Sequence, residues 1–216
     1  MSNNELERNV SDELLWDPKV DHAAIGVSAD DGVVTLRGTV GSFRQKREAK
    51  RDAERVYGVK RINNELEVRV LTTDRRDDAD LRGDVLQALM LDSLVPTTVD
   101  AHVEDGVVTL TGTANWQFQR DEAEFVAANI LGVVAVDEKI DLVAPGPSAH
   151  DVEHSIKKAM ERNAKLDAHG VSVDSSNGTV TLRGTVSSWA DHDEAVSAAW
   201  GAPGVTRVKD HIHVSY

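Results

Sequence analysis

The chain has 216 residues, of which 40% are apolar, 4% are aromatic and none is cysteine. This composition suits small cores of Val, Leu, Ile and Ala, and it excludes disulfides, thiolate metal sites and thiol nucleophiles. The formal net charge of −13 argues against a nucleic-acid partner, because phosphate binding depends on an excess of Lys and Arg.

One nine-residue motif occurs three times along the chain. The run Asp-Gly-Val-Val-Thr-Leu-Arg-Gly-Thr at 31–39 returns with small changes at 105–113 and at 177–185. The spacings of 74 and 72 residues indicate tandem copies of one structural unit. We therefore assign modules to residues 1–72, 77–143 and 148–216, with linkers at 71–76 and 144–149.

An amphipathic helix opens each predicted module. Apolar residues recur at every fourth position, so one face of the helix is expected to be buried. The three stripes are Leu6, Val10 and Leu14, then Leu81, Val85 and Leu89, then Val152, Ile156 and Met160. In the second module Asp77, Asp78 and Asp80 crowd the helix start, where carboxylates cap free N–H groups. We expect capping rather than calcium binding, since the spacing of an EF-hand is missing.

Two strands joined by a tight turn follow each helix. Alternation of apolar and polar residues predicts that one face of each strand is buried. The apolar pairs are Ile25, Val27 and Val34, Leu36; Val99, Ala101 and Val108, Leu110; and Val171, Val173 and Val180, Leu182. Asp-Gly or Asn-Gly lies between the strands, and these pairs tolerate the positive φ angles of a type I′ hairpin turn.

A glycine follows the last apolar residue of each second strand by two positions, at Gly38, Gly112 and Gly184. Its place in the alternation predicts that it faces the core, where it leaves no side chain to pack. We expect the backbone of a helix to approach the sheet closely at this glycine. A β-bulge is the alternative explanation.

A second helix and a last strand complete each module. The helix carries an alanine and is expected to end at a glycine that adopts the left-handed conformation. The alanines are Ala49, Ala123 and Ala195, and the glycines are Gly58, Gly132 and Gly204. The last strands carry Ile62, Leu66, Val68; Val136, Ile140, Leu142; and Val208, Ile212, Val214. The predicted fold class is α+β, with three tandem αββαβ modules that each pack a small three-stranded mixed sheet on two helices.

Basic residues form a stripe along the second helix of the first module. They are Arg44, Arg47, Arg51 and Arg55, flanked by Lys46 and Lys50. Such a row suits the phosphates of an anionic membrane, to which each basic residue contributes about 1 kcal/mol. The alternative is a solvated face whose charges pair locally, for example Arg44 with Glu48.

Large aromatic residues stand near the start of the second helix in every module. They are Phe43, Trp116 with Phe118, and Trp189. Amphipathic rings favour membrane interfaces and protein interfaces, so these residues are candidates for contacting a lipid or a protein partner. The alternative is that each ring fixes the helix onto its own sheet.

Histidines offer one candidate metal pattern. His150 and His154 are one helical turn apart, a spacing that can hold zinc, and His211 and His213 share one face of the last strand. The repeat aligns the second pair with charged residues, so we expect solvent-facing histidines and no metal. The chain has no nucleophile-elbow, phosphate-loop, dinucleotide or His-Glu-x-x-His pattern, so we expect neither a cofactor nor a catalytic centre.

The charges are unevenly distributed over the three modules. Residues 1–72 carry 12 basic and 13 acidic side chains, whereas residues 73–145 carry 5 and 15, and residues 146–216 carry 7 and 9. An anionic partner is therefore expected at the first or the last module. No stretch resembles a membrane span or a secretion signal, so we expect a cytoplasmic protein without a transmembrane segment.

Three features together resemble the BON domain family, named for bacterial OsmY and nodulation proteins. They are the order α-β-β-α-β, the hairpin that ends in Val-Thr-Leu-x-Gly-Thr, and the Gly-Val before the last strand. The resemblance covers nearly the whole chain as three copies. The first family glycine matches Gly38, Gly112 and Gly184, and the second matches Gly58, Gly132 and Gly204.

The resemblance implies a non-enzymatic module linked to envelope and osmotic stress. Members are credited with binding phospholipid surfaces or proteins, and one cytoplasmic branch is credited with sensing potassium. We expect a stress-related binding protein whose three modules combine weak contacts through avidity. The alternatives are a potassium or small-ion sensor, and a scaffold that forms homo-oligomers through exposed strand edges.

Overall fold

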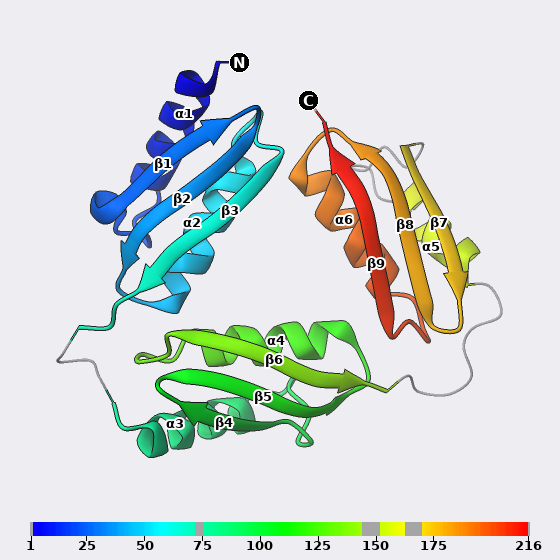
Figure 1. The fold of residues 1–216 in the computed structure, drawn as a ribbon. Helices are drawn as coiled ribbons and strands as arrows, with labels where there is room; N and C mark the ends of the chain where they lie inside the picture. The colour runs from blue at the N-terminus through cyan, green and yellow to red at the C-terminus, as the bar shows by residue number, and fades with distance from the viewer. Residues whose placement is uncertain (1, 72–75, 144–151, 163–169, 216) are drawn as a thin grey trace. The chain divides into compact units, whose positions relative to one another are not determined.

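The computed structural model describes residues 2–71, 76–143, 152–162 and 170–215. Within these ranges the chain repeats helix, strand, strand, helix, strand three times, as Figure 1 shows. The first module contains α1 (Asn3–Trp16), a short 3-10 helix η1 (His22–Ala24), β1 (Ile25–Asp30), β2 (Val33–Val40), α2 (Phe43–Arg55) and β3 (Arg61–Val68). The second contains α3 (Asp78–Leu91), β4 (Asp100–Glu104), β5 (Val107–Ala114), α4 (Gln117–Ala128) and β6 (Ala135–Leu142). The third contains α5 (Val152–Arg162), β7 (Val171–Ser176), β8 (Thr179–Val186), α6 (Trp189–Trp200) and β9 (Arg207–Val214).

Each module has its own three-stranded sheet with the hairpin's second strand in the middle. In the first and third modules the hairpin pairs antiparallel and the last strand pairs parallel to the middle strand. The parallel pair needs a crossover, which the second helix supplies. Both helices of a module lie on one face of its sheet (Figure 1). The predicted α+β class with three repeated modules is therefore confirmed.

The cores lie between each sheet and its two helices. All nine residues of the predicted stripes on the first helices are buried. The buried apolar residues of the described chain are Val, Leu, Ala, Ile and Met, which agrees with the low aromatic content. Small residues on the second helices, such as the fully buried Ala49 and Ala195, let these helices lie close to the sheet.

The three hairpins have the predicted turns. Asp31, Asp105 and Asn177 have φ angles of 45°, 51° and 48°, and the glycine after each also has a positive φ. Positive φ at both central residues is the signature of a type I′ turn. Strand pairing resumes directly on both sides of these two residues, from Asp30 opposite Val33 in the first module.

The repeated glycine of the middle strand has a different role from the one predicted. Gly38 has a φ of +124°, and a Cβ there would lie 1.9 Å from the carbonyl oxygen of Ala24. Gly112 stands in the same relation to Thr98, two residues before β4, and Gly184 to Gly170, directly before β7. The backbone that lies against each glycine thus belongs to neither of the two long helices of its module. The expectation that such a helix approaches the sheet closely at this glycine is therefore wrong.

The register keeps Gly38 on the core side of β2, opposite Ile25, but these glycines are not enclosed in the core. Gly38 is exposed, and Gly112 and Gly184 are half-exposed. Pairing between β1 and β2 continues through Gly38 opposite Ile25 without an inserted residue, so no bulge explains the glycine. Glycine is needed here because its φ is positive and because a carbonyl oxygen occupies the place of a side chain.

The second glycine of each module lies beyond the helix rather than at its end. Helix α2 ends at Arg55, three residues before Gly58. The N–H of Val59 donates to the carbonyl oxygen of Val56 at 3.2 Å, which closes a four-residue turn with Gly58 in its third position. Gly58 has a φ of +93°, and Gly132 and Gly204 have φ angles of +102° and +85°. The positive φ was predicted correctly, but it serves this turn.

The acidic start of α3 also differs in detail from the prediction. Asp77 occupies the N-cap position, yet its side chain makes no capping hydrogen bond. The carboxylate of Asp78 instead accepts hydrogen bonds from the N–H groups of Asp105 and Gly106 at 2.9 and 3.0 Å. This carboxylate therefore joins the helix to the hairpin turn of its own module.

Candidate functional site

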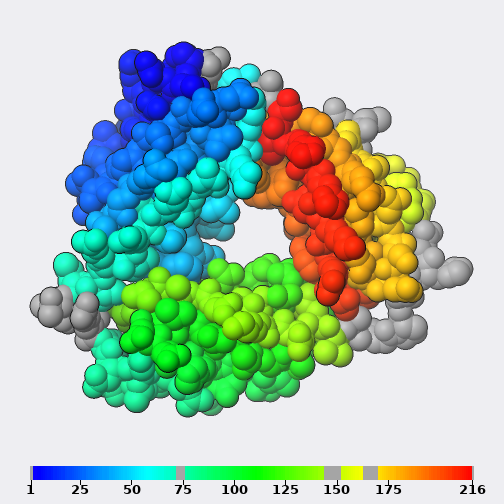
Figure 2. All heavy atoms as spheres, in the orientation of Figure 1, coloured from blue at the N-terminus to red at the C-terminus, as the bar shows by residue number. Residues whose placement is uncertain are grey.

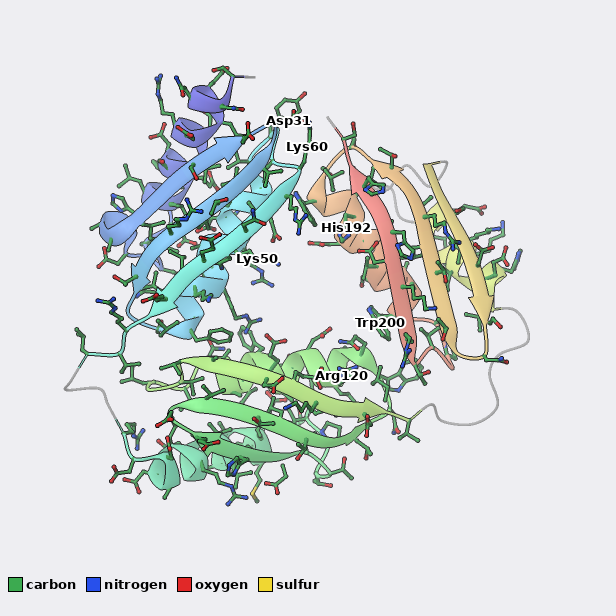
Figure 3. The ribbon with its side chains drawn as sticks, in the orientation of Figure 1. Asp31, Lys50, Lys60, Arg120, His192 and Trp200 are labelled. Atoms are coloured by element: carbon green, nitrogen blue, oxygen red, sulfur yellow. The ribbon has the colours of Figure 1, made fainter. Side chains whose placement is uncertain are left out.

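The basic stripe of α2 divides into exposed and half-buried residues. Arg44, Lys50, Arg51 and Arg55 are exposed, whereas Arg47 and Lys46 are half-buried. Lys50 projects from α2 in Figure 3, and its Nζ lies 3.2 Å from Glu54. Arg51 lies 3.8 Å from Glu48. Part of the stripe is thus paired locally, as the alternative interpretation requires.

The buried side of α2 holds one acidic residue. Asp52 is completely buried, and its Oδ1 accepts a hydrogen bond from the guanidinium of Arg55 at 2.6 Å. Among the described residues its Oδ2 has no hydrogen-bond partner. Burial raises the pKa of Asp52 to about 6, and the neighbouring Arg55 reduces this rise only in part.

Ion pairs join α1 and the segment after it to α2. Lys19 Nζ lies 3.1 Å from Asp17 and 3.3 Å from Glu48, and Arg55 lies 3.1 Å from Glu13. The N–H of Lys19 holds the pKa of Asp17 below its ordinary value, and the hydrogen bond to Asp17 raises the pKa of Lys19. The guanidinium of Arg55 therefore lies beside the last turn of α1, although the chain just after α2 packs against the hairpin turn at Gly32, near the start of α1.

The aromatic residues that are candidates for contacting a partner differ in exposure. Phe43, Trp116 and Trp189 are half-buried, and Trp189 packs against the core of the third module. This placement agrees with rings that fix the helix to its sheet. Phe118 is 51% exposed, so it remains the candidate among these aromatics for contact with a partner.

The ends of the first two opening helices carry exposed apolar residues that periodicity did not single out. Leu15 and Trp16 close α1 with exposed fractions of 60% and 84%. Met90 and Leu91, at the repeat-equivalent positions, close α3 with 85% and 80%. The sequence indicates each pair as two large apolar residues that directly follow the buried stripe but lie outside the apolar face of the helix.

A repeated polar position on the last strand was also missed. On the helix-covered face of β3, β6 and β9 one polar residue interrupts the apolar alternation. These residues are Asn64, Glu138 and Asp210. Each accepts a hydrogen bond from the N–H two residues further on, at Leu66, Ile140 and Ile212. The side chains thereby occupy donors on a strand at the edge of its sheet.

The same polar position contacts the second helix in each module. In the first module the Nδ2 of Asn64 donates to the carbonyl oxygen of Lys46 at 2.9 Å. In the second module the guanidinium of Arg120 binds Glu138, and in the third the Nε2 of His192 lies 2.7 Å from Asp210. Figure 3 shows Arg120 on α4 and His192 on α6. One position in the repeat thus carries three kinds of polar contact.

Among the described residues, the histidine pattern brings no metal site together. His211 and His213 are exposed on β9, and His150 lies outside the described residues. No group of three or more His, Asp or Glu side chains in the described part of the chain is arranged to hold a metal ion. Within the same part, no helix has the length and apolar character needed to cross a bilayer.

The repeated fold agrees with comparisons against known proteins. The sequence profile described as "BON domain" matches residues 2–70, 77–144 and 148–216. The chain therefore belongs to the BON domain family and contains three tandem BON domains.

A curated relative and two solved structures also match. The chain is 32% identical over 145 residues to "Osmotically-inducible protein Y" of Escherichia coli (strain K12), which covers 63% of this chain and 70% of that protein. It is 16% identical to CdsD, a structural protein of the type III secretion system of Chlamydia trachomatis, over 96% of this chain and 91% of that one, with a TM-score of 0.27. A structure of the CdsD C-terminal domain matches with the same identity and TM-score over 100% of both chains.

Proposed function

We propose that this chain is a non-enzymatic, osmotic-stress-related binding protein whose first module contacts anionic phospholipid surfaces. Membership of the BON domain family and similarity to an osmotically inducible protein support the link to osmotic stress. The cytoplasmic location stays a prediction, and fractionation of cells with marker proteins for each compartment tests it.

The observation that carries the lipid proposal is the exposed end of α1. Trp16 and Leu15 are exposed on its last turn, and the guanidinium of Arg55 lies 3.1 Å from Glu13 in the same turn. An exposed aromatic side chain and a basic group are therefore combined beside the last turn of α1.

This combination matches the chemistry of a membrane interface. Tryptophan and tyrosine favour the headgroup region, where the ring is apolar and its polar edge is solvated. Arg51 and Arg55 have exposed side-chain fractions of 64% and 56%, and basic residues near an anionic bilayer contribute about 1 kcal/mol each. Such a contact is weak and depends on ionic strength.

The second module is a poorer candidate for an anionic surface. Met90 and Leu91 repeat the exposed apolar pair, but residues 73–145 carry 15 acidic and only 5 basic side chains. Electrostatic repulsion from an anionic bilayer opposes contact there. The first module is therefore assigned the primary lipid contact.

Vesicle flotation tests the proposal. The full chain should float with vesicles that contain phosphatidylglycerol and not with pure phosphatidylcholine vesicles, and added salt should weaken the association. Trp16→Ala and the double variant Arg44→Glu/Arg51→Glu should each lose flotation. Arg37→Glu is the matched control, since Arg37 is an exposed arginine on β2 that pairs with Glu65. Equal flotation of all variants would refute the assignment and favour a protein partner.

A further inference from the structure

The third module carries a titratable pair where the second carries a pair of fixed charge. By the repeat spacing, His192 on α6 corresponds to Arg120 on α4, and Asp210 on β9 corresponds to Glu138 on β6. An arginine stays protonated at every physiological pH, whereas a histidine changes its charge between about pH 5 and pH 8. The contact between second helix and last strand is thus pH-independent in one module and pH-dependent in the other.

The imidazole of His192 lies between two carboxylates. Its Nε2 is 2.7 Å from an oxygen of Asp210, and its Nδ1 is 3.1 Å from an oxygen of Asp193. The side chain is only 14% exposed, and the ring of Trp189 stands edge-on with 4.9 Å between ring centroids. Figure 3 shows His192 projecting from α6.

This arrangement is complete only when the imidazole is protonated. A neutral imidazole has one N–H and one lone pair, so one of the two carboxylates would face a nitrogen that cannot donate. The imidazolium donates from both nitrogens and carries the charge opposite to its two partners. The two carboxylates therefore favour the protonated form of His192.

The other charged groups near the pair do not compensate for a lost proton. Asp191 on the same helix is bound by the hydroxyls of Ser187 and Ser188 at 2.7 and 2.8 Å. Lys209 and His211 flank Asp210 on β9 but are exposed on the alternate face of the strand. Within the described residues, the charged side chains in contact with the imidazole are Asp193 and Asp210.

We propose that His192 and Asp210 form a pH-dependent latch that holds the start of α6 on β9 more tightly when the imidazole is protonated than when it is neutral. Asp210 also accepts the N–H of Ile212, and β9 lies along the visible surface of the third module, red in Figure 2. Deprotonation therefore weakens the hold on an edge strand and on the packing of Trp189 together. Mild acid tightens this module.

The direction of the effect follows from the pKa of His192. Hydrogen bonds to Asp193 and Asp210 raise this pKa above its ordinary value of 6.5 despite the opposing effect of burial. A raised pKa means that the folded module binds the proton more tightly than the unfolded chain does. The stabilisation is fully present below 6.5 and is lost as the pH rises through the pKa of the folded state.

A histidine titration by NMR on the full chain tests the latch. The His192 signal is the one that disappears in His192→Gln, or in His192→Arg if the first variant does not fold. We expect its midpoint above 6.5, and a lower midpoint in Asp210→Asn, because one of the hydrogen bonds that raise the pKa of His192 loses its charged acceptor. His213→Gln is the matched control, because His213 is an exposed histidine of the same strand and should leave the midpoint unchanged.

A rescue variant separates the latch from a merely structural role. His192→Arg copies the pair of the second module and should keep the third module equally stable at about pH 5 and pH 8. The wild type should lose stability over this range, as followed by thermal unfolding and by the part of the fluorescence that Trp189→Phe removes. A midpoint at or below 6.5, a midpoint unaffected by Asp210→Asn, or the same loss of stability in His192→Arg would overturn the proposal.

Discussion

The carboxylate of Asp52 is fully buried and meets the guanidinium of Arg55 at 2.6 Å, three residues further along α2. The other modules have Val126 and Ala198 at the corresponding position. The charge is therefore not a requirement of the fold. An ionised carboxylate with one unpaired oxygen inside a small module opposes folding.

Replacing this carboxylate should stabilise the first module. Because the pKa of Asp52 is raised to about 6, its contribution to stability is fully present below the ordinary value of 3.8 and is lost as the pH rises through about 6. Asp52→Val should add about 1–3 kcal/mol at neutral pH and remove this part of the pH dependence. Urea unfolding at neutral and acid pH measures both effects. Asp52→Asn separates charge from shape, and a destabilised Asp52→Val at neutral pH would contradict the account.

The contact between Gly38 and Ala24 should make the glycine irreplaceable. Gly38→Ala places a Cβ against a carbonyl oxygen at a positive φ, so the expected loss is at least about 2 kcal/mol of unfolding free energy. Gly83→Ala is the matched control, because nothing lies within 4 Å of its added Cβ inside α3. There the change should stabilise by up to about 1 kcal/mol. Chemical denaturation compares the two, and equal responses would reject the steric explanation.

Close approach of α6 to its sheet should make Ala195 intolerant of larger side chains. Ala195 is fully buried, and extra methylene groups in a packed core force neighbouring side chains from their rotamers. Ala195→Leu is expected to cost about 1–3 kcal/mol. Ser197→Leu, at an exposed position of the same helix, should change stability by less than about 0.5 kcal/mol. Thermal unfolding compares the stability of the two variants, and similar losses of stability would argue against close packing of α6 on its sheet.

The ion pair between Arg120 and Glu138 should stabilise the second module. Both side chains are largely buried, and removal of the cation leaves a carboxylate without its partner. We expect Arg120→Met to cost about 1–3 kcal/mol, reduced from a fully buried pair because water reaches part of the site. Lys139→Met breaks the neighbouring exposed pair with Asp137 and should cost less than about 0.5 kcal/mol. Denaturant titration compares the losses of stability in the two variants. Equal losses would contradict the prediction and would mean that Glu138 finds another donor.

Much of the fold could be predicted from the sequence because its signals are local. The stripe of Leu6, Val10 and Leu14 indicates a helix with one buried face, and this depends only on the 3.6-residue period. The pair Asp31-Gly32 indicates its turn through the φ angles that these two residues tolerate. The threefold recurrence of such signals determined the number of modules without any knowledge of contacts.

Contacts between distant residues were decided only by the tertiary structure. The clash that requires Gly38 comes from Ala24, which the pairing of β1 with β2 brings alongside. His192 meets Asp210, 18 residues later, because α6 crosses back over the sheet to the parallel strand β9. Periodicity reports which face of an element is apolar, but a polar pair or a backbone contact between elements depends on register and crossover, which no short stretch of sequence encodes.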